Sequence, residues 1–427
     1  MAEVAVRIDP GQDGGYGRGT WADAEGRWID FPATTWDGPV RYLGKFEDVS
    51  RFAFSANIRR GRQDETEPYG AGSAGIVVRN LDGFFDPDGP FPLRVRQPIQ
   101  VRSSAKAYGP GTWAEATGTW QDVEPTLTWL GPPLFIGFIE DTDLRYEPSG
   151  DAQLDIRCVD GLSILSNQVI APTAVPFEVT GDRVRRILDA DGVDFPGEAV
   201  VEDGFSLLAA GTADGNATEY LRRAELSEQG RLFVDRTGVL RFLDRRQTFG
   251  TPYVFADDGI GTPFSAVDRF SGARTLFNRI LARREDGPTF AFNDTRSQEE
   301  FSTRTLDLGT LLAASDAIVT GIIEFLTFEF RRPLTRVFAA TVPVDRLSPD
   351  DEYALLELDL FDPADIRFTP PGSDTVVNPS LVQGIEHRIT VGSAWTTQYY
   401  FERRETEVFM ELDDPTLGRL NLNRLGF

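Results

Sequence analysis

Segments in which apolar and polar residues alternate occur near both ends of the chain, and they predict β-strands. The run Phe52–Ile58 alternates with period two and leads into Arg59–Arg62, which indicates a strand followed by a turn. Gly75–Asn80 predicts a second strand. It is closed by segment 81–90, whose Asp-Gly and Pro-Asp-Gly steps favour turns because glycine accepts positive φ. The other predicted strands are 94–102, 133–139, 152–159, 337–342, 353–360, 387–391 and 396–401.

The middle of the chain places apolar residues at helical spacing instead. Residues 180–190 predict a short amphipathic helix. A second helix is predicted over 216–226, where Asn216 can cap the first turn and Glu219 occupies the capping-box position. These signals predict α+β structure between the two β-rich ends.

Two further elements complete this middle region. Residues 230–242 alternate on both sides of a turn at Asp235–Gly238 and predict a β-hairpin. The longest predicted helix runs from Leu308 to about Glu329, and Pro333 ends it.

The order of these elements predicts a β-dominated multidomain protein, in which two barrel-like β domains flank smaller α+β modules. We expect an N-terminal barrel-like domain over 1–165 and a middle α+β region over 166–305. Residues 306–427 are expected to form a helix followed by a C-terminal barrel-like domain.

A duplicated Trp-rich pattern lies within the predicted N-terminal domain, at about 17–48 and 109–141. Gly-Thr-Trp-Ala-Asp-Ala is followed by Trp28 in the first copy, and Gly-Thr-Trp-Ala-Glu-Ala by Trp120 in the second. Two copies are too few for a solenoid, so we interpret them as two related β-excursions. Trp21, Trp28, Trp113 and Trp120 either contact a partner or glycan, or pack one excursion against the other.

Composition excludes several classes of function. The 427 residues include one cysteine, Cys158, and one histidine, His387, too few for disulfide frameworks, Cys/His zinc sites or most nucleophile systems that use histidine. A formal net charge of −24 disfavours binding to nucleic acid. No run of about 18 apolar residues exists, and the first residues lack the pattern of a secretory signal, so we expect neither a membrane span nor secretion.

The remaining candidate chemistry has simpler interpretations. His387 lies in a predicted strand and is expected to be a core or interface residue rather than a catalytic one. Asp82, Asp86 and Asp88 do not have the spacing of a calcium loop, which favours a turn without metal. Asp141 and Asp143 could be imagined as glycosidase carboxylates, but 67 acidic residues make such a pair uninformative. We expect no catalytic residue, cofactor or metal.

Several turn motifs, taken in order, resemble one family of proteins. They are Ile58-Arg59-Arg60-Gly61-Arg62, then Asn80-Leu81-Asp82-Gly83-Phe84-Phe85-Asp86-Pro87, Cys158-Val159-Asp160-Gly161-Leu162, residues 230–238, Ile385-Glu386-His387-Arg388-Ile389 and Trp395-Thr396-Thr397. In order and spacing they resemble the tail-hub family of siphophages, often called minor tail proteins, and they cover most of the chain.

The resemblance implies a non-enzymatic virion protein of the phage tail tip, assembled in the host cytoplasm. It implies a homotrimer whose six barrel-like domains imitate a six-fold ring, docked on the distal tail protein ring and supporting tip or fibre proteins. The tape measure protein is a further candidate partner. DNA would pass through the lumen without specific binding.

Two alternatives remain open at this stage: a receptor- or carbohydrate-binding tail tip protein, and a tail-associated cell-wall hydrolase. For the hub interpretation, the candidate residues for an inter-subunit or fold-defining patch are Arg59, Arg60, Arg62, Asp82, Asp86 and Asp88.

Overall fold

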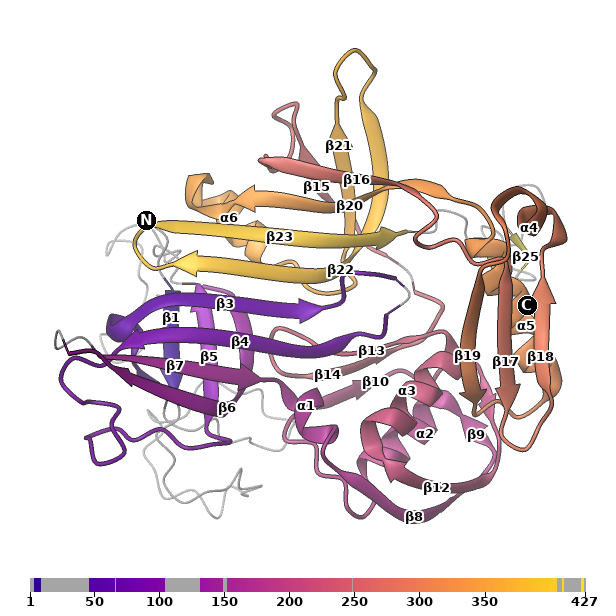
Figure 1. Cartoon of the computed structure of the whole chain (residues 1–427), viewed down its shortest axis with the longest axis horizontal. Helices are drawn as coiled ribbons and strands as arrows, with labels where there is room; N and C mark the ends of the chain where they lie inside the picture. Colours follow the sequence, from indigo (N-terminus) through magenta and orange to yellow (C-terminus); the bar gives the residue numbers. More distant parts are fainter. Residues whose placement is uncertain are drawn as a thin grey trace, which may run out of the picture.

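The computed structural model describes residues 4–8, 46–65, 67–103, 131–148, 152–247, 249–404, 409–410 and 424–425. Most of the ordered structure is β-strand (Figure 1). The helices are α1 (Gly161–Leu165), α2 (Thr180–Leu188), α3 (Ala217–Glu228), α4 (Thr295–Phe301), α5 (Asp316–Phe330) and α6 (Pro349–Leu356). The β-dominated fold class predicted from the sequence is confirmed.

Thirteen strands form one large sheet that contains strands from both ends of the chain. Its main order is β16-β20-β23-β22-β3-β4-β7-β6-β5-β1-β2, and β15 and β21 branch from β22. The bounds are β1 (Val4–Ile8), β2 (Glu47–Asp48), β3 (Ala53–Gly61), β4 (Gly70–Arg79), β5 (Pro98–Ser103), β6 (Pro133–Tyr146), β7 (Ala152–Val159), β15 (Tyr253–Ala256), β16 (Ala266–Gly272), β20 (Leu334–Pro343), β21 (Pro363–Phe368), β22 (Val376–Thr390) and β23 (Ala394–Arg403).

The remaining strands of the described residues form small sheets, nearly all of them from the middle of the chain. They are β8 (Val169–Val175), β9 (Glu178–Val179), β10 (Ala199–Val201), β11 (Leu207–Leu208), β12 (Gly211–Asn216), β13 (Arg231–Val234), β14 (Leu240–Leu243), β17 (Arg279–Arg284), β18 (Thr289–Asn293) and β19 (Thr305–Leu311), with β24 (Phe409–Met410) paired to β25 (Arg424–Leu425).

The N-terminal and C-terminal β regions are joined by the antiparallel pairing of β3 with β22, called here the seam. Its register runs from Gly61 opposite Gly384, through Ile58 opposite His387, to Ser55 opposite Thr390. One hydrophobic core lies beneath both regions and contains residues from Val4 to Phe401. Alternate residues of β4, such as Ile76 and Val78, enter this core, as the period of a strand requires.

The middle of the chain packs around a second core, to the right of the N-terminal strands in Figure 1. Helices α2 and α3 and the hairpin β13–β14 enclose it, which confirms two predicted helices and the predicted hairpin. The side chain of Asn216 accepts a hydrogen bond of 3.0 Å from the backbone N–H of Glu219, so the predicted helix cap is also present.

A third core lies between α5 and the sheet β18-β17-β19. Here the prediction of a helix from Leu308 was wrong at its start, because 308–311 belong to β19, a strand that pairs with β17. The helix begins at Asp316, after Ser315 caps it. An apolar run such as 308–311 can form either a helix or a strand, and here pairing of β19 with β17 made it a strand.

A second correction concerns 353–360, predicted as a strand. Most of this segment belongs to α6 and the turn after it. Ser348 accepts a hydrogen bond from the N–H of Asp351, Pro349 occupies the first turn, and three acidic residues follow. These are local signals for the start of a helix.

The predicted domain boundaries at 165 and 305 stay predictions. The large sheet joins strands of the first and third predicted segments, and it also includes β15 and β16 from the second. The predicted excursions at 17–48 and 109–141 lie mostly outside the described residues, and Trp21, Trp28, Trp113 and Trp120 lie entirely outside them.

Two glycines at the seam allow the backbones of β3 and β22 to approach. A Cβ at Gly61, where φ is +82°, would lie 2.3 Å from the carbonyl oxygen of Gln383, and one at Gly384 would lie 2.2 Å from that of Arg62. We expect Gly61→Ala and Gly384→Ala each to lower the free energy of unfolding by on the order of 2–4 kcal/mol, measured by urea denaturation.

Gly75→Ala in the adjacent strand is the matched control for these variants. No atom lies within 4 Å of a Cβ added there, so we expect a change below about 1 kcal/mol. Equal stability of all three variants would show that the seam does not require glycine.

Candidate interaction surface

Two of the predicted interface arginines lie inside the molecule. Arg60 on β3 is buried and forms an ion pair of 2.5 Å with Asp359, in the turn after α6. The other carboxylate oxygen of Asp359 accepts a hydrogen bond of 2.9 Å from the backbone N–H of Arg236, in the β13–β14 turn. Arg236 also donates to the carbonyl of Leu356 at the end of α6. These contacts tie the N-terminal strands, the middle hairpin and α6 together.

Arg62 is part of a second buried network. Its guanidinium pairs with Glu402 on β23 and lies 4.5 Å from the ring centre of Tyr69. Arg231 on β13 approaches the other oxygen of Glu402 at 3.4 Å. Burial opposes ionisation of Glu402, but the charges of Arg231 and Arg62 outweigh it and hold the pKa of Glu402 below its ordinary value. Both networks therefore join segments that are far apart in the sequence.

His387 lies at the centre of the seam and is fully enclosed. Burial, together with the positive charge of Arg60, lowers the pKa of His387 to about 3. Its Nδ1 is 2.8 Å from the hydroxyl of Thr397, and its ring meets Trp395 edge to face. A neutral, buried imidazole of this kind has no access to a substrate in solution.

Asp160 directly follows β7 and caps the start of α1. Its carboxylate accepts hydrogen bonds from the N–H groups of Gly72 at 2.5 Å and Leu162 at 2.9 Å. Burial nonetheless raises the pKa of Asp160 to about 6.

The predicted acidic patch residues lie near the opposite end of the N-terminal strands, in the turn after β4. Asp86 accepts hydrogen bonds from Asn80 at 2.6 Å and from the hydroxyl of Tyr146 at 2.8 Å, so it holds the turn within the chain. Asp82 and Asp88 are exposed, as is Arg59 on β3. The assignment of these residues to an interface stays a prediction.

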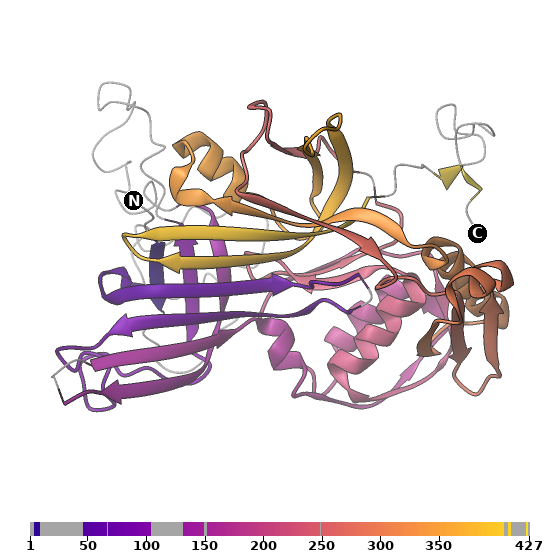
Figure 2. The same ribbon diagram turned by 45° about the horizontal axis from the view of Figure 1, so that its top comes forward.

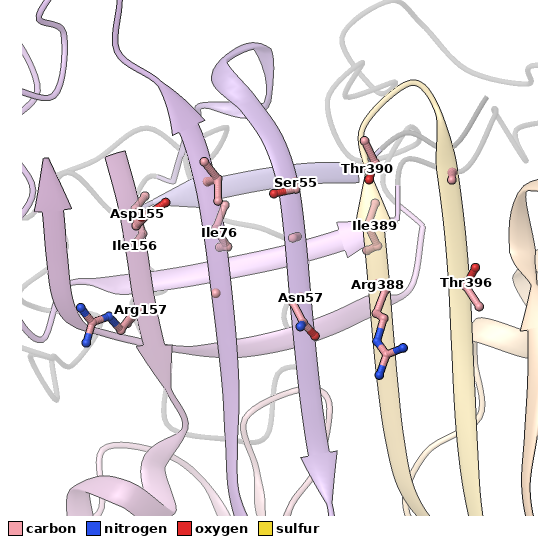
Figure 3. A pocket seen from close by; sticks show the side chains of 14 residues that line it. Ser55, Asn57, Ile76, Asp155, Ile156, Arg157, Arg388, Ile389, Thr390 and Thr396 are labelled. Carbon is pink, nitrogen blue, oxygen red and sulfur yellow. The ribbon is translucent and has the colours of Figure 1, made fainter. Parts of the chain in front are cut away.

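A hollow of about 620 Å³ lies on the outer face of the large sheet, across the seam. Its exposed side chains are mostly polar, since the side chains of Ala56, Ile76 and Ile389 are buried in the core, and no aromatic residue lines it. Figure 3 shows side chains reaching it from β7, β4, β3, β22 and β23. The hollow is therefore lined by residues from both the N-terminal and the C-terminal β regions.

Strand register explains the composition of the hollow. One row across the five strands consists of Arg157, Gly75, Asn57, Arg388 and Thr396, each residue opposite the next. Small side chains in the middle of the row leave space, because a Cβ on Gly75 would meet nothing within 4 Å. The two arginines stand at either side of this space, about 14 Å apart at the usual strand spacing.

Both arginines are exposed and carry charge to the rim of the hollow. Arg157 is 58% exposed and pairs with Asp143 and Asp141, while Arg388 is 64% exposed and pairs with Glu386 at 2.8 Å. Each guanidinium has five N–H donors, so these pairs leave donors for a further partner. The carboxylates of Asp141 and Asp143 are thus engaged with an arginine on the neighbouring strand.

Sequence reasoning did not find this hollow. Its residues come from five strands, and only pairing across the sheet brings them together. The one local signal was the Ile385–Ile389 motif, where alternation places His387 inside and Arg388 outside. Among the described residues, no group of three or more His, Cys, Asp or Glu side chains could hold a metal ion. None of the described helices has the length and apolarity that a membrane crossing requires.

The whole fold is similar to that of two solved tail proteins. A tail protein from Neisseria meningitidis MC58 matches with a TM-score of 0.55 at 10% identity, over 94% of this chain and 97% of that one. The 43 kDa tail protein of prophage MuSo2 from Shewanella oneidensis matches with a TM-score of 0.57 at 10% identity, over 94% and 98%. No protein-family model and no curated protein matches the sequence. The resemblance to phage tail proteins is confirmed at the level of the fold.

The buried Glu402 network permits a direct test of its role. Glu402→Gln would leave the guanidinium groups of Arg62 and Arg231 without their buried counter-charge, and we expect a loss of about 3 kcal/mol in the free energy of unfolding. Glu147→Gln is the matched control, since it breaks the exposed Arg145–Glu147 pair of 3.1 Å and should cost at most about 1 kcal/mol. Urea denaturation measures the free energy of unfolding of both variants. Similar decreases for the two would show that the buried Glu402 network contributes no more to stability than an exposed ion pair.

His387 should make the protein sensitive to acid. The unfolded chain binds a proton on this imidazole near pH 6.5, whereas the folded chain does so near pH 3. This contribution to stability is complete above pH 6.5 and decreases by about 1.4 kcal/mol per pH unit as the pH falls between the two values. Relative to wild type, His387→Gln should therefore gain stability on acidification from pH 6 to pH 4, measured by urea denaturation at each pH.

The control for this variant is Thr397→Val. It removes the same hydrogen bond but keeps the imidazole, so it should lose stability without altering the pH dependence. Because Asp160 contributes the opposite slope between about pH 4 and pH 6, only the difference between each variant and wild type is informative. Parallel pH profiles for His387→Gln and wild type would show that the imidazole titrates normally in the folded state.

Proposed function

We propose that this chain is a non-enzymatic structural component of a bacteriophage tail, a hub subunit at the tail tip. The observation that carries the proposal is the fold: nearly the whole chain corresponds to nearly the whole length of two tail proteins. A large sheet with a common core, built from both ends of the chain, suits a structural subunit that must keep its shape.

In this role the subunit self-associates as a homotrimer and docks on the distal tail protein ring. Its far side supports tip or fibre proteins, and the ring surrounds part of the channel through which DNA is ejected. The net charge of −24 is consistent with a channel that DNA passes without binding. The buried state of His387 and the lack of aromatic residues in the hollow support a structural role over catalysis or glycan binding at these sites.

The proposal predicts the size of the protein in solution. Light scattering on the purified chain should give three times its mass of 47.4 kDa at micromolar concentration. Because each copy carries a large negative charge, added salt should favour the assembled form by screening repulsion.

Purified virions provide the independent test. Mass spectrometry should find the chain in intact particles at a few copies each. A protein that stays monomeric at all concentrations and is absent from particles would overturn the proposal, and sustained release of sugar or peptide from host cell wall would replace it with the hydrolase alternative.

A further inference from the structure

The small sheet beside the third core ends in a strand whose outer edge pairs with nothing in the described part of the chain. Strand β18 pairs with β17 on one side, and Figure 1 shows it as the outermost strand of this sheet. The sheet and α5 lie at one end of the molecule, to the right in Figures 1 and 2. An exposed edge presents N–H and C=O groups with the spacing of a β ladder, and another extended strand is their natural partner.

One hydrogen bond shows which residues of β18 face this edge. The N–H of Asp294, directly after the strand, donates to the carbonyl of Asn278 at 3.0 Å, so the backbone of Asp294 points toward β17. Backbone directions alternate along a strand, so every second residue from Asn293 backwards points away from β17. The residues with outward N–H and C=O groups, called here the edge residues, are Thr289, Ala291 and Asn293.

The sequence of β18 does nothing to prevent pairing at this edge. Charged residues, proline or bulges usually protect edge strands, but β18 reads Thr-Phe-Ala-Phe-Asn and pairs regularly with β17. By contrast, edge strand β16 of the large sheet has a bulge between Asp268 and Arg269. The edge of β15 is covered by Thr262, which bonds to Val254 and Ala256. Strand β18 is therefore open to a partner strand.

Apolar rings lie beside the open edge. Helix α5 packs over β17 and β18. Phe292 is opposite Ile280 of the third core, so its ring lies on the side of α5, yet it is 37% exposed. Phe328 of α5 is 48% exposed, and Arg331 stacks on its ring at 4.0 Å and pairs with Asp294 at 3.3 Å. Both rings thus lie near the end of β18, where an added strand would cover apolar surface.

A second copy of β18 fits this edge in an antiparallel register centred on Ala291. In that register all three edge residues of each strand meet edge residues of the other. Phe290 of each copy then lies beside Phe292 of the other, and such cross-strand aromatic pairs stabilise antiparallel sheets. A shift by two residues would leave one edge residue of each strand without a partner.

Charge also favours the antiparallel arrangement. Asp286 is exposed in the turn before β18, at a φ of +57°, and Arg296 is exposed just after the strand. Each lies five residues from Ala291 along the chain. Pairing centred on Ala291 therefore brings Asp286 of each copy near Arg296 of the other. These opposite charges offset part of the repulsion between two chains of net charge −24.

We propose that two copies of this chain join edge to edge through β18, with Ala291 on the twofold axis and Phe292 of each copy covered. This contact is isologous and closes on itself, so it is separate from the threefold association proposed above and joins two assemblies. Five residues from each strand bury less area than a stable interface requires, so the contact forms at higher protein concentration than the trimer.

Disulfide cross-linking of the full-length chain tests both the contact and its register. Cys158, the single native cysteine, is buried and does not compete. Under mild oxidation Ala291→Cys should form a covalent dimer, because Cα atoms facing each other in such a pair are about 5.5 Å apart, within the range of a disulfide. Thr289→Cys and Asn293→Cys should not link when each is alone, but an equimolar mixture of the two should.

Ala266→Cys is the matched control, since it also replaces an exposed alanine on an edge strand, β16, and it should stay unlinked. Equal linking of Ala266→Cys and Ala291→Cys, or linking of Thr289→Cys alone, would overturn the proposal. Light scattering on the same samples separates this proposal from the hub proposal. A trimer without the Ala291→Cys link overturns the strand contact alone, whereas a specific link in a protein that never forms trimers overturns the threefold association alone.

Charge at the centre of the edge provides a second readout. Ala291→Lys and Ala291→Glu each place like charges opposite one another, so each should weaken the twofold contact on the order of tenfold in sedimentation experiments at increasing concentration. An equimolar mixture of the two should restore the contact, because lysine then faces glutamate. Ala266→Lys should leave it unchanged. Equal association of the wild type and both Ala291 variants would show that β18 does not mediate the contact.

Discussion

The structure depends on one joint, the antiparallel pairing of β3 with β22. These strands are more than 300 residues apart in the chain, yet their backbone hydrogen bonds turn two β regions into a single sheet over one core. Closing so long a loop costs conformational entropy, which the joint must offset with close backbone contact and burial. Gly61 and Gly384 permit that closeness, because any larger side chain at either position would meet a carbonyl oxygen. The mixed origin of the sheet, the position of His387 and the hollow on the outer face all follow from this pairing.

The joint also explains why charged groups lie inside the molecule. Arg60 lies on β3 and Arg62 directly after its end, and both are buried against the C-terminal region, where Asp359 and Glu402 neutralise them. Each acid also contacts an arginine of the middle hairpin, so three parts of the chain share each network. A buried ion pair adds little net stability compared with apolar packing, but a missing partner is costly. Such networks therefore favour one arrangement of the modules over alternatives with similar apolar burial.

On the opposite face, the same pairing creates a surface that neither β region has alone. Small residues of β3 and β4 meet Arg388 and Thr396 of the C-terminal hairpin, and the result is a shallow, mixed hollow with an arginine at each side. Strand β22 lines the hollow at one end and pairs with β21 at the other.

The sequence by itself determined the features that depend on contacts between neighbouring residues, namely strands, helix caps and turns. Alternation identified most strands of the large sheet, and the Asn216 cap and the Asp235–Gly238 turn were correct because their hydrogen bonds lie within a few residues. The prediction from alternation failed at 308–311 and 353–360, where apolar residues suit either a helix or a strand. Pairing with β17 made the first segment a strand, and the cap at Ser348 favoured a helix in the second. The sequence also singled out Arg60 and Arg62 without showing that they are buried, since their partners are about 300 or more residues away. Only the tertiary structure decided that two β regions share one sheet and that the hollow exists, because strand order and register depend on contacts between distant segments that no local pattern encodes.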